Sequence, residues 1–384
     1  MIHVTDKFNC CGCHACFEVC PTNCIEMQAD SEGFLYPHVH VDNCINCHKC
    51  EKACPILNKV SNHNTTRAFA VQNKDENVRL ASSSGGMFTL LADYVIDNDG
   101  IVIGAAFDDN LELIHIATNN KSVISKLREA KYIQSKIADT FNIAKDCLEQ
   151  GKLVLFTGTP CQISGLLNTL NHSYDNLITQ DIICHGVPSP KVWNEYVKHL
   201  NKKFHKEIIN VQFRNKDSGW KSYSLKYTFS DGSDAISLAS KDPYMLLFLN
   251  NLSLRPSCYA CHFKGLDRPS DFTLADFWGI KNILPQIDDD KGTSLVFVNT
   301  EKGHRIFELL SEKNLHFEVD ITEAVKYNTS AINSANEPTN RAQFMNQLSI
   351  QPFTNLSKKF VPKRAAKSLL KHLIRKLKLM LNSR

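Results

Sequence analysis

Between residues 67 and 313, short apolar runs alternate with stretches in which apolar residues recur three or four positions apart. Runs rich in Val, Ile and Phe are typical of strands, and the wider spacing is typical of helices. The runs predict strands at 67–72, 100–107, 111–118, 152–157, 177–184 and 294–299. The spacing predicts helices at 87–96, 137–150, 190–204 and 303–313. This order of elements predicts a mixed α/β body.

The remaining patterns divide the chain into parts. Alternate residues are apolar in segments between 206 and 240, which predicts antiparallel strands there. Residues 58–66 are polar and aperiodic, which is typical of a linker. We therefore expect a small N-terminal head, a body in two parts and a C-terminal tail, with the boundaries 1–60, 67–150, 151–340 and 363–384.

The composition is that of a globular protein, because 43% of the 384 residues are hydrophobic and 22% are charged. No stretch reaches the ~18 consecutive apolar residues of a membrane span. The N-terminus lacks the apolar stretch of a secretory signal, so we expect a cytoplasmic protein. Residues 1–362 hold 36 Lys and Arg against 40 Asp and Glu, and so offer no basic surface for nucleic acid.

Ten of the fifteen cysteines lie within the first 54 residues. In a chain that is not exported, thiols stay reduced, so this density favours metal binding over disulfide bonds. Two runs share one spacing, with two, two and three residues between successive cysteines and a proline after the last. They are Cys10, Cys13, Cys16 and Cys20, and, 34 residues later, Cys44, Cys47, Cys50 and Cys54.

This spacing is that of a bacterial dicluster ferredoxin, in which the fourth cysteine of each run binds the other cluster. The repeat implies two similar half-domains, so we expect two 4Fe–4S clusters in the head. The first would be bound by Cys10, Cys13, Cys16 and Cys54, and the second by Cys44, Cys47, Cys50 and Cys20.

Three alternatives use the same cysteines. Cys-x-x-Cys-His strings, which begin at Cys10, Cys44 and Cys258, can attach c-type haem. Haem attachment would leave Cys16, Cys20, Cys50 and Cys54 without a role. Four thiolates can also hold structural zinc, although the third cysteine and the Cys-Pro ending favour iron–sulfur. A disulfide framework does not suit a reducing compartment.

Four further residues of the head lie outside the predicted ligand set. His14 and His48 occupy equivalent places in the repeat, and we expect both at the surface beside a cluster. The alternative is a hydrogen bond that tunes the potential of each cluster. Cys11 and Cys24 are surplus to the two runs, and we expect them to pack as small apolar residues.

Two glycine-containing turns in the body could hold phosphate, although neither G-x-G-x-x-G nor G-x-x-x-x-G-K-[ST] occurs. Ser84, Gly85 and Gly86 precede a predicted helix, where hydroxyls and free amides suit a diphosphate. The alternative is an ordinary serine N-cap. Residues 158–162 follow a predicted strand, and Pro160 suits the first turn of a helix.

Four cysteines of the body are candidates for a third cluster. Cys161 follows one predicted strand and Cys184 ends the next, so neighbouring parallel strands would place both at one sheet edge. Cys258 and Cys261 form a Cys-x-x-Cys pair in a loop. Either these four thiols bind one 4Fe–4S cluster, or they are unrelated thiols and a structural pair. Cys147 lies in a predicted helix and is expected to be inert.

Several motifs of the body resemble one known family. They include Gly158-Thr159-Pro160-Cys161-Gln162 and the segments 84–86, 131–135, 185–189, 213–216, 219–220 and 271–279. Over residues 67–340 these motifs resemble the beta-subunit family of coenzyme F420-reducing hydrogenases and F420-dependent dehydrogenases. A fused two-cluster ferredoxin head is common in the bacterial members of this family.

The resemblance implies a non-covalent FAD held near Ser84, Gly85, Gly86, Gly158, Thr159, Pro160 and Gln162. It also implies iron–sulfur ligation by Cys161, Cys184, Cys258 and Cys261. Members of the family use the flavin to reduce or oxidise an organic substrate or a deazaflavin-like coenzyme. Relatives of this type also occur among bacterial proteins of polysaccharide synthesis.

Two functions of different classes are consistent with these features. In the first, the chain is an oxidoreductase in which clusters and FAD connect an external electron-carrying protein with a small-molecule substrate. Arg214, Lys216 and Trp220 are then candidates for binding an acidic or aromatic group; the alternative is a solvated hairpin with a packing tryptophan. Asp271 and Asp276 are either polar site residues or structural caps, and no catalytic acid or base is assigned. In the second, the chain only relays electrons to a partner enzyme.

The tail, residues 363–384, contains eight Lys and Arg and no acid, and its apolar residues recur three or four apart. A basic amphipathic helix of this kind suits an anionic membrane surface, so we expect peripheral contact with the inner face of the membrane. The alternative is a terminal helix that docks on the acidic body.

Overall fold

The computed structural model describes residues 1–60 and 66–361. The predicted amphipathic tail lies outside the described residues, so the structure does not test it. None of the helices in the two described ranges combines the length and the apolar character that a membrane span requires.

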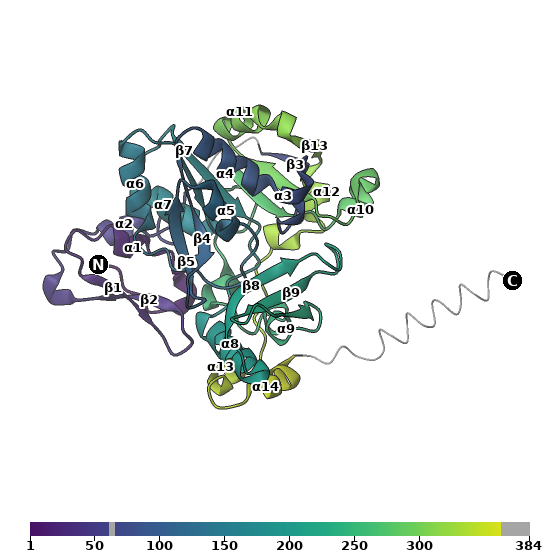
Figure 1. Ribbon diagram of the computed structural model, residues 1–384. Helices are drawn as coiled ribbons and strands as arrows, with labels where there is room; N and C mark the ends of the chain where they lie inside the picture. Colours follow the sequence, from purple (N-terminus) through teal and green to yellow (C-terminus); the bar gives the residue numbers. More distant parts are fainter. Residues whose placement is uncertain (61–65, 362–384) are drawn as a thin grey trace.

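The head consists of a two-stranded sheet and short helical turns (Figure 1, purple). Its elements are η1 (Lys7–Asn9), α1 (Ala15–Glu18), β1 (Ile25–Ala29), β2 (Leu35–Val39), η2 (Val41–Asn43) and α2 (Lys49–Ala53). Strands β1 and β2 pair antiparallel. The two helices contact each other, and each of them also contacts α7 (Pro160–Leu170) of the body.

The body is built on one mixed sheet of eight strands. From edge to edge they are β13 (Asn314–Val319), β3 (Arg67–Asn73), β12 (Ser294–Val298), β11 (Phe272–Asp276), β7 (Leu177–Ile182), β6 (Val154–Thr157), β4 (Ile101–Phe107) and β5 (Leu113–Thr118). Strands β11, β7, β6 and β4 run parallel. Because β3 and β11 both pair antiparallel with β12, β3 runs in the same direction as β11 and the other three parallel strands. The carboxyl ends of these five strands therefore meet at one edge, where α/β proteins bind ligands.

All six predicted strands of the body are confirmed, and so are its four predicted helices as α4 (Met87–Asp97), α6 (Thr140–Glu149), α8 (Pro190–Phe204) and α11 (Glu301–Leu309). The patterns did not predict β11 and β13. The two parts of the body, 67–150 and 151–340, contribute strands to the same sheet.

Helices cover both faces of the sheet, and the side chains of each strand alternate between them. In β6, Leu155 packs with α4, α5 (Lys121–Leu127) and α11 on one face. Val154 and Phe156 pack with α6 and α7 on the other face. Cys11, Cys13 and Ala15 of the head belong to that second cluster. The head is therefore docked on the α6–α7 side of the body (Figure 1).

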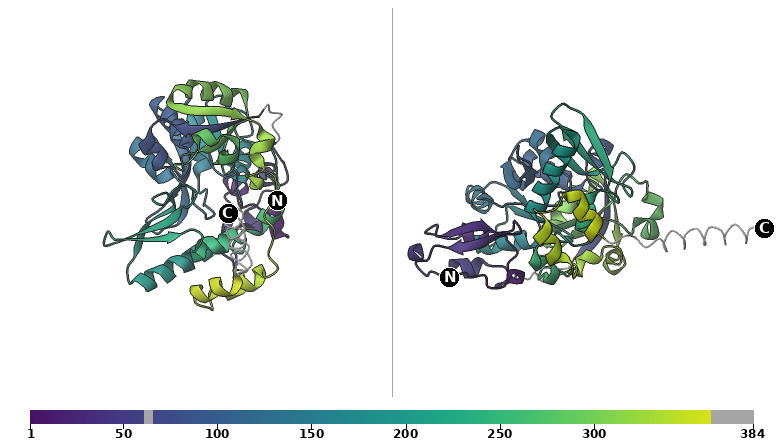
Figure 2. Two further views of the ribbon diagram at one scale, coloured as in Figure 1. Left: turned by 90° about the vertical axis from the view of Figure 1, so that its right-hand side faces the viewer. Right: turned by 90° about the horizontal axis from the view of Figure 1, so that it is seen from below.

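A second, three-stranded sheet lies beside the first. Its strands β8 (Ile208–Asn215), β9 (Ser224–Phe229) and β10 (Asp234–Leu238) are antiparallel, as the alternation between 206 and 240 predicts. It packs with α8, α9 (Pro243–Leu249), α13 (Arg341–Gln347) and α14 (Phe353–Phe360). Figure 2 shows these helices on the side of the body away from α4 and α11.

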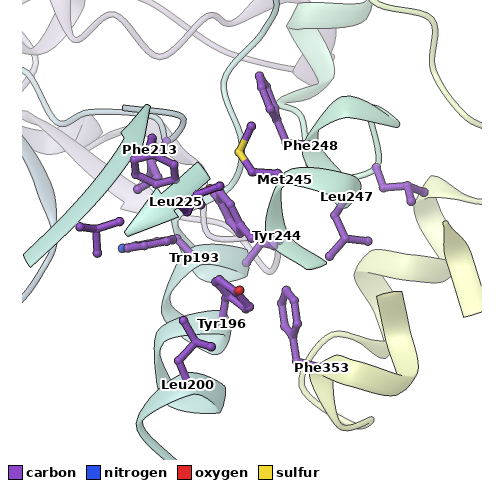
Figure 3. Packing of buried hydrophobic residues seen from close by; sticks show 14 of the residues in the cluster. Trp193, Tyr196, Leu200, Phe213, Leu225, Tyr244, Met245, Leu247, Phe248 and Phe353 are labelled. Carbon is purple, nitrogen blue, oxygen red and sulfur yellow. The ribbon is translucent and has the colours of Figure 1, made fainter. Parts of the chain in front are cut away.

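Aromatic side chains fill the core between these elements (Figure 3). Tyr196 from α8, Tyr244 from α9 and Phe353 from α14 pack together, with the Tyr196 and Tyr244 rings 5.6 Å apart. Short elements complete the body: α3 (Glu76–Leu80), η3 (Pro256–Ala260), α10 (Ile280–Ile283), η4 (Pro285–Ile287), η5 (Ser311–Lys313), α12 (Ile321–Val325) and η6 (Thr329–Ala331).

Candidate iron–sulfur and flavin sites

The head cysteines line two separate cavities. The inner cavity, of about 30 Å³, is lined by Cys10, Cys13, Cys16 and Cys54. The outer cavity, of about 20 Å³, is lined by Cys20, Cys44, Cys47 and Cys50. In each cavity the fourth cysteine of one run lies with the first three of the other run. This is the grouping on which the crossed ligand assignment depends.

The 34-residue repeat is also present in the backbone. Gly12 and its equivalent Asn46 have positive φ, and so do His14 and its equivalent His48. His14 directly precedes α1, and His48 directly precedes α2. The left-handed region favours Gly and tolerates Asn and His. These residues therefore let each cysteine loop turn sharply around its cavity.

The two equivalent histidines have different surroundings. His48 is exposed, as expected, and its Nδ1 lies 2.7 Å from Glu51 Oε2. His14 is only 5% exposed and lines the inner cavity, so the expectation of a surface position is wrong for this residue. Burial, reinforced by the charge of Arg255, lowers the pKa of His14 to about 4. The ring is therefore neutral at pH 7.

The four cysteines of the body line one cavity of about 40 Å³, here called the body cavity. Cys161 is the second residue of α7, and Cys184 lies two residues beyond β7. Because β6 and β7 are parallel neighbours, both reach the carboxyl edge of the sheet. Cys258 lies in η3, and Cys261 ends that turn. The structure thus brings the four thiols together from three segments of the chain.

A fifth cysteine reaches the body cavity from the head. Cys11 and Ile56 line both the inner cavity and the body cavity. The Cys11 thiol contacts the thiols of Cys13 and Cys161. The prediction that Cys11 packs as a small apolar residue is confirmed by its burial. Sequence patterns missed its place in the wall between the two cavities.

The donor chemistry of these cavities suits iron–sulfur clusters. All fifteen cysteines are free thiols. Burial raises the pKa of Cys184 to about 12, and contact with Cys11 together with burial raises the pKa of Cys161. Buried thiolates therefore need a cation, which iron supplies. In residues 1–60 and 66–361 no three Cys, His, Asp or Glu side chains are close enough to hold a single metal ion. A 4Fe–4S cubane is instead held at four separate iron atoms.

The first candidate phosphate turn lies between α3 and α4, and some of its polar groups already form hydrogen bonds within the protein. Ser84 Oγ donates to Thr293 O at 2.7 Å, and the Gly85 amide donates to Ser294 Oγ at 2.9 Å. Gly86 is the N-cap residue of α4, with φ of 87°, and no side chain caps this helix. The alternative of an ordinary serine N-cap is therefore wrong. The amides of the first turn of α4 have no side-chain acceptor at the cap.

The second candidate turn, residues 158–162, begins α7 as expected, with Pro160 in its first turn. Thr159 and Gln162 form a capping box, in which the Thr159 amide donates to Gln162 Oε1 at 2.9 Å. Gln162 Nε2 donates to Ser135 Oγ at 2.9 Å. Gln162 therefore stabilises the start of α7. Pro160 lines the body cavity.

Residues 130–135 connect the two turns. The Ala130 amide donates to Ser83 Oγ at 2.6 Å, beside the first turn. Ser135 accepts the Gln162 hydrogen bond in the second turn. Both turns follow strands whose carboxyl ends lie at one edge of the sheet, with β12, β11 and β7 between them. The segment therefore runs along the edge from one candidate turn to the other.

Among the candidate substrate residues, Trp220 is packed and Lys216 is half-buried, but Arg214 is buried, so the solvated-hairpin alternative is wrong for Arg214. Arg214 is 2% exposed, and its Nη2 donates to Asp276 Oδ1 at 3.1 Å. Trp220 Nε1 donates to the same oxygen at 3.0 Å. The Arg214 guanidinium lies 3.7 Å from the centre of the Tyr223 ring, and its Nε and Nη1 have no hydrogen-bond partner. Lys216 Nζ donates to Arg79 O and Lys291 O, each at 2.7 Å.

The two aspartates of segment 271–279 have different roles. Asp271 begins the β11 segment at the end opposite to the carboxyl edge and accepts hydrogen bonds from the amide and hydroxyl of Thr179 and from the hydroxyl of Thr300. It is a structural residue. Asp276 ends β11 at the carboxyl edge and pairs with Arg214. Asp276 therefore remains a candidate site residue.

These features define an iron–sulfur protein with an N-terminal two-cluster head, and two parts of the chain match known protein families. Residues 9–57 match the 4Fe-4S dicluster domain. Residues 151–323 match the family described as the C terminus of the coenzyme F420 hydrogenase/dehydrogenase beta subunit. The chain therefore joins a 4Fe–4S dicluster domain to a C-terminal domain of the coenzyme F420 hydrogenase/dehydrogenase beta-subunit family. The resemblance noted in the sequence is confirmed.

One chain in the structure titled "Xenon derivatization of the F420-reducing [NiFe] hydrogenase complex from Methanosarcina barkeri" is 15% identical to this protein, with a TM-score of 0.47. The similarity covers 74% of this chain and 93% of that chain. No curated protein sequence matches the chain.

Replacing Cys20 by alanine should remove the cluster of the outer cavity and leave that of the inner cavity. Cys20 follows the first run in sequence but lies with Cys44, Cys47 and Cys50. The electron paramagnetic resonance (EPR) spectrum of the Cys20→Ala protein should therefore match that of Cys44→Ala. Cys24→Ala is the matched control, because Cys24 Sγ lies 3.4 Å from Cys20 Sγ in the same cavity but is not a predicted ligand. A Cys20→Ala spectrum that instead matches Cys13→Ala contradicts the crossed assignment.

Proposed function

We propose that the chain is an iron–sulfur flavoprotein oxidoreductase that passes electrons between 4Fe–4S clusters and FAD and so reduces or oxidises an organic substrate or a deazaflavin-like coenzyme. The observation that carries the proposal is the body cavity. Four cysteine thiols face it, and its wall at Cys11 and Ile56 is also the wall of the inner cavity. A relay from the head into the body requires such adjacent sites.

Three sets of thiols would hold the clusters, each set around one cavity: Cys10, Cys13, Cys16 and Cys54; Cys20, Cys44, Cys47 and Cys50; and Cys161, Cys184, Cys258 and Cys261. When bound, 4Fe–4S clusters carry single electrons and FAD exchanges a hydride with an organic molecule. Cys47 is exposed, so the outer cavity is the part of the head that an external electron-carrying protein would approach. Cys11 separates the inner cavity from the body cavity by one side chain.

For FAD we propose the carboxyl edge of the sheet between Ser84, Gly85 and Gly86 and residues 158–162. The uncapped N-terminus of α4 supports this position, because helix N-termini favour phosphate groups. Lys216 holds the first turn in place, because its Nζ donates to Ser84 O within the turn, to Arg79 O before it and to Lys291 O of a distant segment. Pro160 belongs to the second turn and to the wall of the body cavity, which supports a flavin next to the third cluster.

For the substrate we propose an organic molecule with an acidic or aromatic group, with acceptors of polysaccharide synthesis as one class. Two nitrogens of the Arg214 guanidinium are buried without a hydrogen-bond partner, and such donors suit an anionic group. Trp278 is 41% exposed and stacks on Trp220, with their ring centres 5.3 Å apart. The stacked pair offers a flat apolar surface close to Arg214.

A second function is an electron-relay subunit with no organic substrate of its own. The internal hydrogen bonds of the candidate flavin residues favour it. The hydroxyl of Ser84, the amide of Gly85 and the side chain of Gln162 are all engaged by protein groups. In this case the electrons that enter through the head would leave through a partner enzyme.

Iron and flavin analysis of anaerobically purified protein distinguishes the two functions. The oxidoreductase predicts about twelve irons per chain, from three clusters of four, together with one flavin. The relay predicts the clusters without flavin. Eight irons and no flavin would refute the proposed oxidoreductase. The absorption spectrum of the same sample reports flavin bands and the broader iron–sulfur absorption separately.

A further inference from the structure

Arg255 is a fully buried charge at the joint between head and body. It directly precedes η3, the turn that carries Cys258. Its guanidinium reaches into the head, where Nε donates to Cys10 O at 2.8 Å and Nη2 donates to Leu35 O at 2.9 Å. On the body side, Nη1 donates to Gln134 Oε1 at 3.0 Å. One side chain therefore links the segment of a body cysteine to a cysteine loop of the head.

The same guanidinium faces a sulfur atom of the inner cavity. Arg255 Nη2 lies 3.5 Å from Cys10 Sγ, within range of an N–H···S hydrogen bond. Gly12 permits this approach, because its φ is +67° and a Cβ there would lie 2.7 Å from Arg255 Nη1. Gln134 holds the loop from the other side, since its Nε2 donates to Cys11 O at 3.2 Å. The position of the guanidinium against the sulfur is thus fixed by both domains.

Arg255 differs from the other buried arginines in its electrostatic partners. Within residues 1–60 and 66–361, four buried arginines pair with a carboxylate: Arg79 with Asp289, Arg214 with Asp276, Arg268 with Asp181 and Arg341 with Glu32. In the same part of the chain no carboxylate lies within ion-pair distance of Arg255. Its neighbours are neutral oxygens, the Cys10 sulfur and the rings of Phe34 and Tyr36.

A buried cation without an anion is strongly unfavourable. The cysteines of the inner cavity provide the missing anion once they bind iron as thiolates, because a cluster with four thiolates is negatively charged. An iron–sulfur cluster in this cavity therefore accounts both for the burial of Arg255 and for its contact with sulfur.

We propose that Arg255 is the counter-ion of the inner 4Fe–4S cluster and raises its reduction potential. The inference rests on the proposed ligation by Cys10, Cys13, Cys16 and Cys54. Reduction adds negative charge to the cluster, so a fixed cation stabilises the reduced state more than the oxidised state. Hydrogen bonds to the sulfurs and local charge are the means by which proteins set cluster potentials. Arg255 acts on the cluster through position and charge and takes no part in chemistry.

An EPR-monitored redox titration of the full-length reconstituted protein tests this role. In Arg255→Gln the midpoint of the inner cluster should move to a more negative potential, while the outer cluster stays unchanged as an internal reference. The signal that remains in Cys20→Ala identifies the inner cluster. Arg255→Lys keeps the charge but loses the fork of donors, so its shift should be smaller and in the same direction.

Arg341→Gln is the matched control. Arg341 is also buried at the joint and pairs with Glu32 of the head at 2.5 Å, but it donates to no cysteine. The Arg341→Gln variant should leave the midpoint potential of the inner cluster unchanged. An unchanged midpoint in Arg255→Gln, or an equal shift in Arg341→Gln, overturns the proposal. If Arg255→Gln loses its iron, the titration of Arg255→Lys provides the test. An unchanged midpoint potential of the inner cluster in Arg255→Lys then overturns the proposal.

The titration measures only the midpoint potentials of the two head clusters. A protein that lacked flavin and the body cluster would therefore contradict the proposed oxidoreductase and still give a result for Arg255. Conversely, a midpoint insensitive to Arg255 in a protein with twelve irons and flavin would remove the counter-ion role and leave the oxidoreductase intact.

Discussion

Replacing Cys258 by alanine is expected to lower the iron content from about twelve to about eight atoms per chain, with both head clusters retained. Cys258 is one of four thiols around the body cavity, and its Sγ accepts a hydrogen bond from the Val187 amide at 3.4 Å. Alanine provides neither the ligand nor this acceptor. Iron analysis and EPR at low temperature measure the loss. Reduction of the flavin through the head should fall to background in the same protein.

Two controls separate loss of a ligand from loss of a thiol. Cys147 lies in α6, and it is not among the residues that line the three cavities. Cys147→Ala should keep about twelve irons and full flavin reduction. Cys11→Ala should also keep its iron, because Cys11 is a fifth thiol beside a complete set of four. If Cys258→Ala still bound twelve irons, the body cluster would have to be abandoned.

The cysteine sites could largely be predicted because their geometry is local. The spacing within each run determines the loop around the cavity, and the 34-residue repeat reappears as positive φ at Gly12 and Asn46. The meeting of Cys161 and Cys184 required only one further assumption, that β6 and β7 are parallel neighbours, and the structure confirms it. Apolar runs bounded by turns suffice to predict such strands.

The joint between head and body could not be predicted in this way. It depends on hydrogen bonds from Arg255 to Cys10 and on the ion pair of Arg341 with Glu32, between residues more than 200 positions apart in the chain. Periodicity reports which face of an element is apolar, but not which distant residue meets it. The nearest sequence signal for Arg255 is its position three residues before Cys258.

The candidate flavin residues show a second limit. The hydroxyl of Ser84 was expected to be free for phosphate, but it donates to Thr293 O, next to β12. The alternative to substrate binding by Arg214 was a solvated side chain, but Arg214 is buried against Asp276, and only two nitrogens of its guanidinium are left without a hydrogen-bond partner. In both cases a segment distant in sequence supplies the partner. A turn motif thus indicates where a ligand could lie, and the fold decides which of its groups remain available.

Replacing Gly86 by aspartate is expected to expel FAD and to retain the iron. Gly86 is the N-cap residue of α4, so a carboxylate there would face the proposed diphosphate. Two unit charges about 5 Å apart at an effective dielectric constant of about 20 repel each other by roughly 3 kcal/mol. This energy corresponds to a loss of affinity of more than about a hundredfold. Flavin content after desalting, and the dissociation constant for added FAD, measure the effect.

Gly86→Ala is the control that separates charge from backbone strain. Gly86 has φ of +87°, and a Cβ there would lie 3.1 Å from Asn73 Cβ, so both variants bear steric strain. The left-handed conformation costs alanine roughly 1–2 kcal/mol, and aspartate tolerates it better. Strain alone would therefore make the alanine variant the weaker flavin binder, whereas charge repulsion makes the aspartate variant much the weaker. Equal flavin content in Gly86→Asp and the unmodified protein would place the diphosphate away from the start of α4.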